Sequence, residues 1–335
     1  MNNSLKLDGD LSHHIDSATH LLKCIISFLG FIGNLSVILV YRCKTHKSSS
    51  EILICTIAWS DLCSCAQCVV FTILFYANIH NLYPLILCLT NNVSFNTIYT
   101  FTNILIMVVA INRFYAVCQP HMYNITFCRR NVNWVIVLAF ITGILSSGNE
   151  PFLCKAYQDN DIKGLKSKVK FWFFFRVILL IVTITVLFFS YSLVYLAIRR
   201  TSLRLESHQK LQPATATSMV TCISTDAPSS QVQQRRPRSN VNCKQDRLTT
   251  TLFVVSGVYL LLYLPDIIFY AFYHYTNWFK DTLTKGILKN SCQILFVLNF
   301  SINPVLYYLV NTFYREKIEM AKNLVKKSVF ECHHI

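Results

Sequence analysis

The chain has 335 residues, of which 53% are hydrophobic and only 14% are charged. A soluble domain carries about 25% charged residues, so the composition excludes an ordinary soluble protein and favours a membrane protein. The net charge of +15 would also suit nucleic-acid binding. However, the basic residues lie in short segments between apolar runs, which is the pattern of membrane topology. We therefore expect no nucleic-acid partner.

A helix that spans a bilayer needs about 20 mostly apolar residues. Seven stretches meet this requirement, and they cover residues 21–42, 52–77, 88–118, 131–153, 171–198, 247–274 and 284–310. Most lack the alternation that marks the strands of a membrane barrel. The sequence therefore predicts an all-α membrane protein, a bundle of seven transmembrane helices.

The lysines and arginines of the connecting segments indicate the orientation. Connections on the side of the C-terminus hold 20 of them, and connections on the side of the N-terminus hold 10. The cytoplasmic side of a membrane protein carries the excess. We therefore expect a multi-pass protein of the plasma membrane with an extracellular N-terminus and a cytoplasmic C-terminus.

The chain divides into an extracellular tail (1–20), a membrane domain (21–310) and a cytoplasmic segment (311–335). The tail has no apolar core or cleavage site of a signal peptide, so we expect the first span to act as its own insertion signal. Asn2 opens an Asn-Asn-Ser sequence, which matches the acceptor pattern for glycosylation.

Two cytoplasmic segments have distinctive compositions. Residues 200–246 are rich in Ser, Thr, Gln and Pro, which predicts a disordered loop. The basic flanks of this loop suit either anionic membrane lipid or a soluble partner. After the seventh span, an amphipathic helix on the membrane surface is predicted. Its apolar face holds Phe313, Ile318, Leu324 and Val325.

Charged and amide side chains within the spans are costly and are therefore candidates for function. For Asn34 we favour a simple hydrogen bond between helices. Asn299 and Asn303 lie one helical turn apart, and Pro304 removes a backbone donor, which frees a carbonyl. For Asp61 together with these two asparagines, a functional polar site and plain interhelical bonding both remain open.

Cys88 and Cys154 both fall in the predicted outer region, where disulfides persist. We favour a bridge over two free buried cysteines. Arg113 follows Cys88 by 25 residues, or roughly 37 Å of helix, so one helix can place Cys88 at the outer surface and Arg113 at the inner one. Arg113 is then either an ordinary boundary charge or a working residue.

Several motifs recur in a fixed order along the spans. They are Gly33-Asn34, "IAWSD" ending at Asp61, Cys88 placed 25 residues before Arg113, Trp134, Tyr191, Leu264-Pro265, and "NPVLY" from Asn303 to Tyr307 followed by Phe313. In this order and spacing, the chain resembles the rhodopsin-like (class A) G-protein-coupled receptors. The resemblance covers nearly the whole chain except 200–246.

The resemblance implies that Cys88 and Cys154 form the outer disulfide. It implies no cofactor other than sodium as an allosteric modulator, in a cavity lined by Asp61, Thr102, Asn299 and Asn303. It also implies an activation switch that couples to a heterotrimeric G protein, formed by Asn112, Arg113, Tyr191, Tyr259, Tyr263, Pro265, Asn303, Pro304 and Tyr307. In this switch Arg113 turns toward the G protein, and Pro265 is the hinge of the sixth helix.

The chain departs from the family pattern at four of its positions. Asn112 replaces the usual acidic residue before Arg113, Tyr263 replaces a tryptophan, and Tyr259 replaces a phenylalanine. Thr183 stands where the fifth span usually has a proline, so we expect a straighter fifth helix. These departures are typical of a divergent member.

The neutral Asn112 predicts a weak restraint on Arg113, because it offers only a neutral hydrogen bond. A second restraint on Arg113 would be an acidic group at the inner end of the sixth helix, but the residue at that position is the neutral Gln245. The adjacent Asp246 could replace it.

Two classes of ligand are disfavoured by residues of the spans. Phe95 stands where receptors for biogenic amines carry an aspartate, and Val297 stands where opsins carry the retinal-linked lysine. A peptide or a small polar ligand is favoured. An asparagine before the arginine also occurs in melatonin receptors, so an indole ligand remains an alternative.

The expected ligand-binding residues are Asn92, Phe95, Asn96, Arg176, Tyr263 and Asp266. Arg176 and Asp266 are expected to pair, because opposite charges within a membrane are costly apart; the alternative is that each reaches the outer interface.

The sequence therefore predicts a receptor that binds an extracellular ligand and activates a heterotrimeric G protein by movement of the sixth helix. The alternatives are a membrane-embedded enzyme, channel or transporter. An enzyme is disfavoured because the sequence has no HExxH, no GxSxG and no Cys/His metal spacing. A channel or transporter is also disfavoured, because we find neither the inverted halves nor the paired broken helices in the sequence that such a protein would be expected to show.

Overall fold

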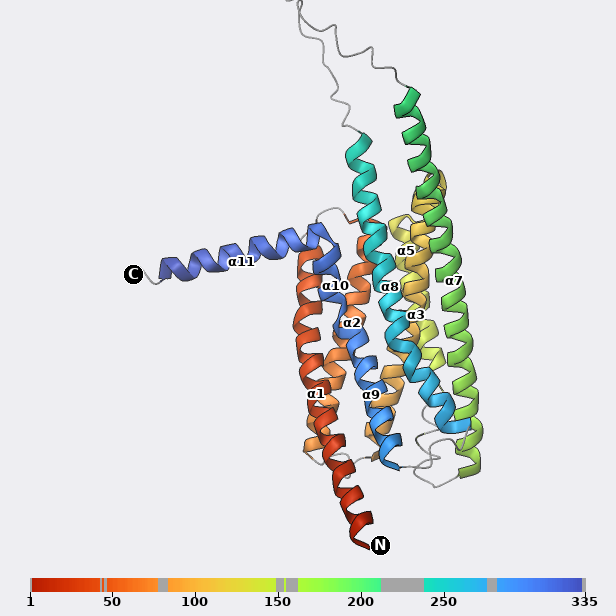
Figure 1. Ribbon diagram of the computed structural model, residues 1–335, viewed down its shortest axis with the longest axis vertical. Helices are drawn as coiled ribbons and strands as arrows, with labels where there is room; N and C mark the ends of the chain where they lie inside the picture. The colour runs from red at the N-terminus through yellow and green to blue at the C-terminus, as the bar shows by residue number, and fades with distance from the viewer. Residues whose placement is uncertain are drawn as a thin grey trace, which may run out of the picture.

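The computed structural model describes residues 2–42, 44, 47–77, 84–148, 154, 162–211, 238–275 and 282–332; toward the ends of several helices only the backbone is described. These residues form helices throughout (Figure 1). In chain order the helices are α1 (Asn2–Arg42), α2 (Ser49–Tyr76), α3 (Pro84–Cys118), α4 (Pro120–Thr126), α5 (Arg129–Ser146), α7 (Ile162–Leu211), α8 (Arg238–Tyr275), α9 (Thr282–Ser301), α10 (Asn303–Val310) and α11 (Thr312–Cys332).

The long helices lie side by side in one bundle, and α11 leaves the bundle at a steep angle (Figure 1). By length and composition, α1, α2, α3, α7 and α8 each contain a segment able to cross a membrane. Two bent pairs, α4 with α5 and α9 with α10, raise the number to as many as seven. This architecture confirms the predicted all-α bundle.

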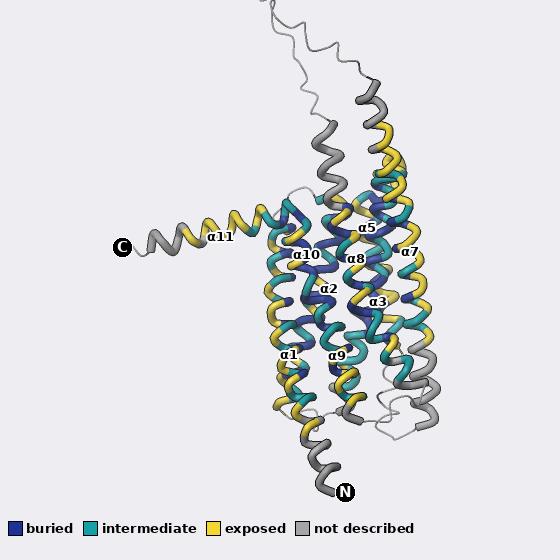
Figure 2. The backbone as a smooth tube through the Cα atoms, in the orientation of Figure 1, coloured by how far each residue is buried: buried dark blue, intermediate teal, exposed yellow. Residues whose placement is uncertain are grey.

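The bundle exposes its apolar side chains on the outside. Figure 2 shows buried residues facing the interior of the bundle and exposed residues along the outer faces of α1 and α7. Many exposed residues are large and apolar: Leu145 is 75% exposed and Phe188 is 67% exposed. A surface of this kind is stable only against lipid hydrocarbon, because monomeric soluble proteins rarely expose apolar patches of this extent.

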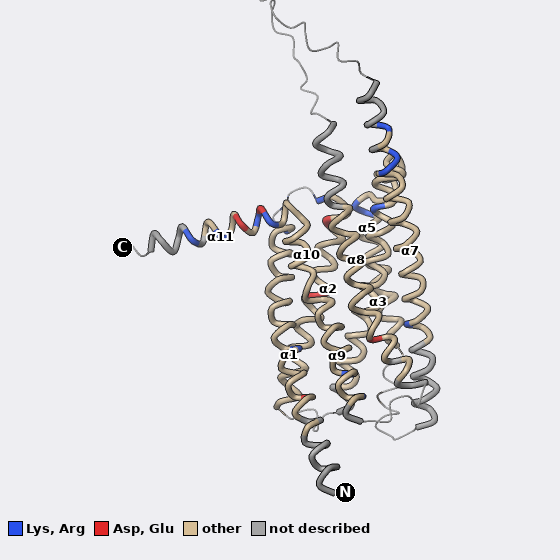
Figure 3. Tube along the Cα trace, viewed as in Figure 1, with Lys and Arg blue, Asp and Glu red and all other residues tan. Residues whose placement is uncertain are grey.

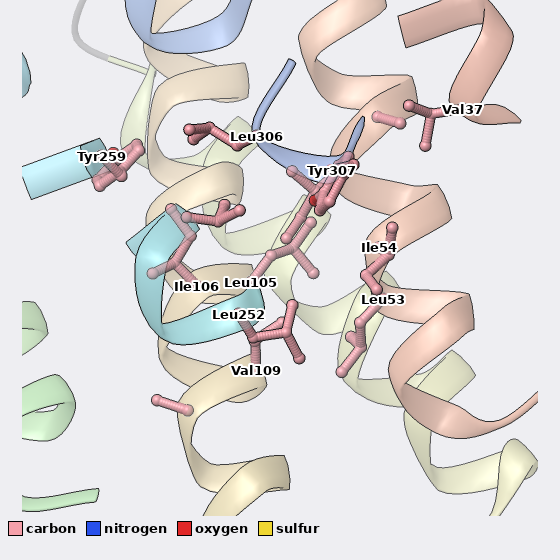
Figure 4. Close-up of a cluster of buried hydrophobic side chains, with 14 of the residues drawn as sticks. Val37, Leu53, Ile54, Leu105, Ile106, Val109, Leu252, Tyr259, Leu306 and Tyr307 are labelled. Carbon is pink, nitrogen blue, oxygen red and sulfur yellow. The ribbon is translucent and has the colours of Figure 1, made fainter. Parts of the chain in front are cut away.

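One buried cluster joins most of the helices in the half of the bundle nearer to α11. It includes Val37 of α1, Leu53 and Ile54 of α2, Leu105, Ile106 and Val109 of α3, Leu252 and Tyr259 of α8, and Leu306 and Tyr307 of α10 (Figure 4). Because these side chains come from helices far apart in sequence, the cluster fixes the relative positions of the polar groups described below.

The seventh span is bent by 49° between α9 and α10. The bend coincides with Pro304, which has no backbone N–H to donate to the carbonyl of Phe300 four residues earlier. Asn34 of α1 donates its Nδ2 to this Phe300 oxygen at 2.9 Å. The interhelical role predicted for Asn34 is therefore confirmed, and its partner is the carbonyl that the proline frees.

The corner between α10 and α11 is held by one buried asparagine. Asn311 Oδ1 accepts from the backbone N–H of Tyr314 at 3.1 Å, and Asn311 Nδ2 donates to the hydroxyl of Tyr41 in α1 at 2.9 Å. Asn311 thus caps the start of α11 and joins it to α1. Phe313 and Ile318 pack against the core, whereas Leu324 is exposed, as suits a helix lying on a membrane surface.

The first helix extends further than expected. α1 begins at Asn2, within the segment expected to be a tail. Its polar groups find partners on neighbouring helices: the Asp16 side chain accepts from Asn290 Nδ2 of α9 at 2.7 Å, and the backbone oxygen of Ser17 accepts from the Tyr76 hydroxyl of α2 at 2.6 Å. These contacts stabilise helix where hydropathy gives no signal.

The segment 200–246 is also partly helical, because α7 continues to Leu211 and α8 begins at Arg238. Residues 212–237 lie outside the described residues. Extending an existing helix costs far less than nucleating one, and the sequence after residue 198 is rich in good helix formers. α7 passes through Thr183 without a break, which agrees with the predicted straighter fifth helix.

Candidate functional site

Arg113 lies near the end of α3 and is only 2% exposed. Its Nη2 donates to Oδ1 of the neighbouring Asn112 at 2.7 Å, and Ser50 of α2 donates its hydroxyl to the same Oδ1, also at 2.7 Å. One neutral oxygen thus accepts from the arginine and ties α3 to α2, and Tyr123 of α4 is a second neighbour that interacts with Arg113. The bond to Asn112 is the hydrogen-bond restraint that the sequence predicts, whereas the role of Ser50 was not predicted.

Several polar atoms around Arg113 have no hydrogen-bond partner among the described residues. They include Arg113 Nε, Asn112 Nδ2 and the hydroxyl of Tyr307. The hydroxyls of Tyr191 and Ser256 lie 3.2 Å apart and connect α7 to α8. Buried polar groups without partners are costly. A different arrangement of these side chains, in which the unused donors find acceptors, would therefore lower that cost.

A small cavity with polar and aromatic walls lies at the level of Asp61, in the middle of α2. The cavity has a volume of about 30 Å³ and is lined in part by Asp61, Ser64, Thr102 and Asn299. Asn303 donates its Nδ2 to Asp61 Oδ2 at 2.6 Å. The structure therefore brings together the four residues predicted to surround a sodium ion.

Oxygen atoms dominate the polar lining of this cavity. Asp61 Oδ2 accepts the Asn303 hydrogen bond, and the Thr102 hydroxyl lies 2.7 Å from that of Ser60. A volume of about 30 Å³ can hold about one or two water-sized species. A carboxyl group beside hydroxyl and amide side chains offers the oxygen ligands that a hard monovalent cation prefers. Ser60 and Ser64 were not predicted, because serine is common in apolar helices.

Three tyrosines stack beneath the expected ligand region. The ring centroids of Tyr99 and Tyr263 lie 4.9 Å apart, and those of Tyr259 and Tyr263 lie 6.0 Å apart. Their hydroxyls and Asn103 Oδ1 have no hydrogen-bond partner among the described residues. Tyr259 and Tyr263 thus place polar groups where the family pattern has Phe and Trp.

Arg176 and Asp266 are not joined by an ion pair within 4 Å among the described residues, although the charge of Arg176 acts on the Asp266 carboxyl. Among the described residues, the single ion pair within 4 Å joins Lys44 and Glu51. Arg176 instead donates to Asn96 Oδ1 of α3, and its guanidinium lies 5.5 Å from the centroid of the Tyr99 ring. A neighbouring helix that offers both an amide oxygen and an aromatic face is a sufficient partner for an arginine.

The other expected ligand-binding residues lie on the same side. Phe95 packs toward Phe296 of α9 with centroids 6.4 Å apart. Asn92 donates its Nδ2 to Cys88 Sγ at 3.4 Å and to Cys154 Sγ at 3.7 Å. Cys88 and Cys154 form a disulfide, which confirms the predicted bridge and places it directly above the α3 residues of this region.

Four residues singled out in the sequence have side chains outside the described part of the chain. They are Asn2, Gln245, Asp246 and Val325, which all lie on helices. Within the described part, no group of three or more His, Cys, Asp or Glu side chains is arranged to hold a metal ion.

Comparison with known proteins is consistent with this geometry. The family model described as "7 transmembrane receptor (rhodopsin family)" matches residues 33–307. The crystal structure of squid rhodopsin shares the fold, with a TM-score of 0.66 and 12% sequence identity over 92% of this chain and 85% of that chain. No curated protein matches the sequence.

Proposed function

We propose that this chain, which belongs to the rhodopsin family of seven-transmembrane receptors, binds an extracellular ligand and activates a heterotrimeric G protein. Family membership makes it a multi-pass membrane receptor for signalling and not an enzyme. The observation that carries the proposal is the buried Arg113, which is restrained by one neutral oxygen of Asn112.

The coupling step follows from the contacts of Arg113. Outward movement of the end of α8 would separate the Tyr191 and Ser256 hydroxyls, which are 3.2 Å apart. Tyr191 would then be available to Arg113, and so would Tyr307, whose hydroxyl has no described partner. The rearranged arginine and tyrosines form the surface that we assign to the G protein.

The proposed ligand is a peptide or a small polar molecule. It would lie between α3, α7, α8 and α9, above the stacked rings of Tyr99 and Tyr263. Phe95 and Phe296 supply apolar area, and Arg176 supplies a charged group already oriented by Asn96. Asp266, on which the charge of Arg176 acts, supplies a carboxyl group for a cationic or hydrogen-bonding group of the ligand.

Sodium is the proposed allosteric modulator. When bound, it would supply a positive charge beside the carboxylate of Asp61. The chain's own contribution is a set of oxygens from Asp61, Thr102 and Asn299, with Asn303 holding the second carboxylate oxygen. An ion held there would favour the present spacing of α2, α3 and α9 over a more closely packed one.

The test of the receptor function is nucleotide exchange on purified G proteins. The full chain in nanodiscs is incubated with several G-protein classes and with libraries of peptides and small molecules. A ligand that accelerates exchange on one class, with no acceleration by Arg113→Ala at equal protein amount, supports the proposal. Trp134→Ala is the control variant, because Trp134 is exposed on the outer face of α5. Arg113→Ala exchange equal to that of the wild type would reject the assigned role of Arg113.

A further inference from the structure

A cleft of about 570 Å³ opens between α7 and α8, in the half of the bundle that contains Arg113. Its walls are mainly apolar and are formed by Leu187, Phe188, Val194 and Ile198 of α7 with Phe253 and Leu260 of α8. Phe188 and Phe253 are exposed on the outer face of the bundle. The cleft therefore opens toward lipid hydrocarbon and not toward water.

The cleft is not filled by the protein itself. A Cβ atom added at Gly257, which lines the cleft, would meet no atom within 4 Å. Protein interiors are close-packed and contain few voids larger than a water molecule, whereas pockets that hold larger ligands measure about 300–1,000 Å³. The size and the apolar lining of the cleft suit a hydrocarbon chain.

The end of the cleft is basic. Ile198 is followed directly by Arg199 and Arg200, which are both exposed. Arg199 lies one helical turn after Tyr195, another residue of the cleft wall. Neither arginine is within 4 Å of an acidic side chain among the described residues. Figure 3 shows further Lys and Arg residues of the described chain gathered at this end of the bundle.

We propose that the cleft binds an anionic phospholipid from the leaflet at the Arg113 end of the bundle. One acyl chain lies between Phe188 and Phe253, and the headgroup contacts Arg199 and Arg200. The charge of the arginines favours an anionic headgroup, since a zwitterionic lipid has no net negative charge to attract them. The acyl chain lies against Tyr191, which also lines the cleft, so the occupant contacts a residue of the proposed activation switch.

Photolabelling tests this site without any ligand or G protein. The full chain is placed in phosphatidylcholine nanodiscs with a trace of phosphatidylserine that carries a diazirine on its acyl chain. Labelled peptides are then mapped by mass spectrometry. We expect labels concentrated in residues 184–198 and 249–260 and displaced by unlabelled phosphatidylserine. Labels spread evenly over the lipid-facing helices, including the exposed face of α5, would overturn the proposal.

Matched variants separate the cleft from general lipid contact. Gly257→Leu places a side chain in the cleft and should remove most of the label. Gly286→Leu is the control, because a Cβ at Gly286 of α9 also meets no atom within 4 Å; its labelling should equal that of the wild type. Equal labelling of Gly257→Leu and Gly286→Leu would exclude the cleft as the site.

The headgroup is tested separately. Each of Arg199→Gln and Arg200→Gln should weaken phosphatidylserine binding about fivefold, the effect of one basic residue at an anionic surface. A phosphatidylcholine probe should be unaffected by either change. Equal labelling by the two probes in the wild type would contradict the proposed headgroup contact. If a photoreactive sterol labels the cleft and phosphatidylserine does not, the occupant is a sterol and the proposal is wrong.

Discussion

Asn112 presents a single oxygen to two donors, Arg113 Nη2 and Ser50 Oγ. Asn112→Asp would turn the Arg113 hydrogen bond, whose donor is already charged, into an ion pair. It would also make the neutral Ser50 hydrogen bond charge-assisted, and charge-assisted bonds are about twice as strong as neutral ones. The conformation in which residue 112 holds Arg113 should be stabilised by on the order of 1 kcal/mol. This shifts the equilibrium between that conformation and the active one by about fivefold. We expect Asn112→Asp to lower ligand-free nucleotide exchange by about this factor, measured at matched surface expression.

The opposite change has a matched variant. Ser50→Ala removes one donor from Asn112 Oδ1 and loosens the tie between α2 and α3, so ligand-free exchange should rise. Identical ligand-free exchange in the wild type, Asn112→Asp and Ser50→Ala would mean that packing elsewhere, and not this oxygen, sets the basal activity.

Asp61 gives a prediction about sodium. Adding sodium should lower the affinity of an agonist for the wild type, by about tenfold if the coupling is of ordinary size. Asp61→Asn keeps the shape and removes the charge, so the agonist affinity of this variant should not depend on sodium. The measurement is agonist binding in sodium and in a large organic cation at equal ionic strength. Equal sodium dependence in both proteins would rule out Asp61 as the ligand of the ion.

These residues differ in how visible they are in the sequence. Asp61 and Asn303 stand out because a carboxylate or an amide is rare within an apolar run. Ser50 and Ser60 do not, since a serine can satisfy its hydroxyl within its own helix. The hydrogen bond from Arg176 to Asn96 was not predicted, because it depends on the rotation of α7, which hydropathy does not determine.

At the scale of elements, the bend between α9 and α10 depends on a carbonyl shared between two helices. Asn34→Ala leaves the Phe300 oxygen without its donor, which costs about 1–3 kcal/mol. We expect a lower midpoint of thermal unfolding, measured in detergent. In the Pro304→Ala background residue 304 regains an N–H, so the same Asn34→Ala change should lower the midpoint less. Additive effects of the two changes would show that the proline and the asparagine act independently.

The spans themselves were predictable, whereas the polar continuations of some helices were not. A run of about 20 apolar residues identifies a spanning segment, and α2 and α3 end within a few residues of the expected limits. The helical continuations of α1, α7 and α8 are polar, so hydropathy gives no signal for them. Their length reflects helix propagation and, in α1, partners such as Asn290.

At the scale of the whole molecule, the distribution of basic residues predicts orientation. We expect an epitope tag fused before Met1 to bind antibody on intact cells, and a tag after Ile335 to bind only after the membrane is permeabilised. The physical reason is the excess of Lys and Arg on the side of the C-terminus. Flow cytometry of both fusions measures this. Staining of the C-terminal tag on intact cells would reverse the proposed topology.

The two flanks of the bundle differ in clearance. A Cβ at Gly30 would lie 2.5 Å from Ser301 Oγ, and a Cβ at Gly33 would lie 2.8 Å from Pro304, so α1 meets α9 and α10 almost backbone to backbone. At Gly257, between α7 and α8, the same atom would meet nothing within 4 Å. The α1 flank is therefore closely packed, whereas the α8 flank has free space into which a helix can move. We expect α8 to move during activation while α1 stays in place. Backbone amide hydrogen exchange should therefore be slow in α1 and fast in α8.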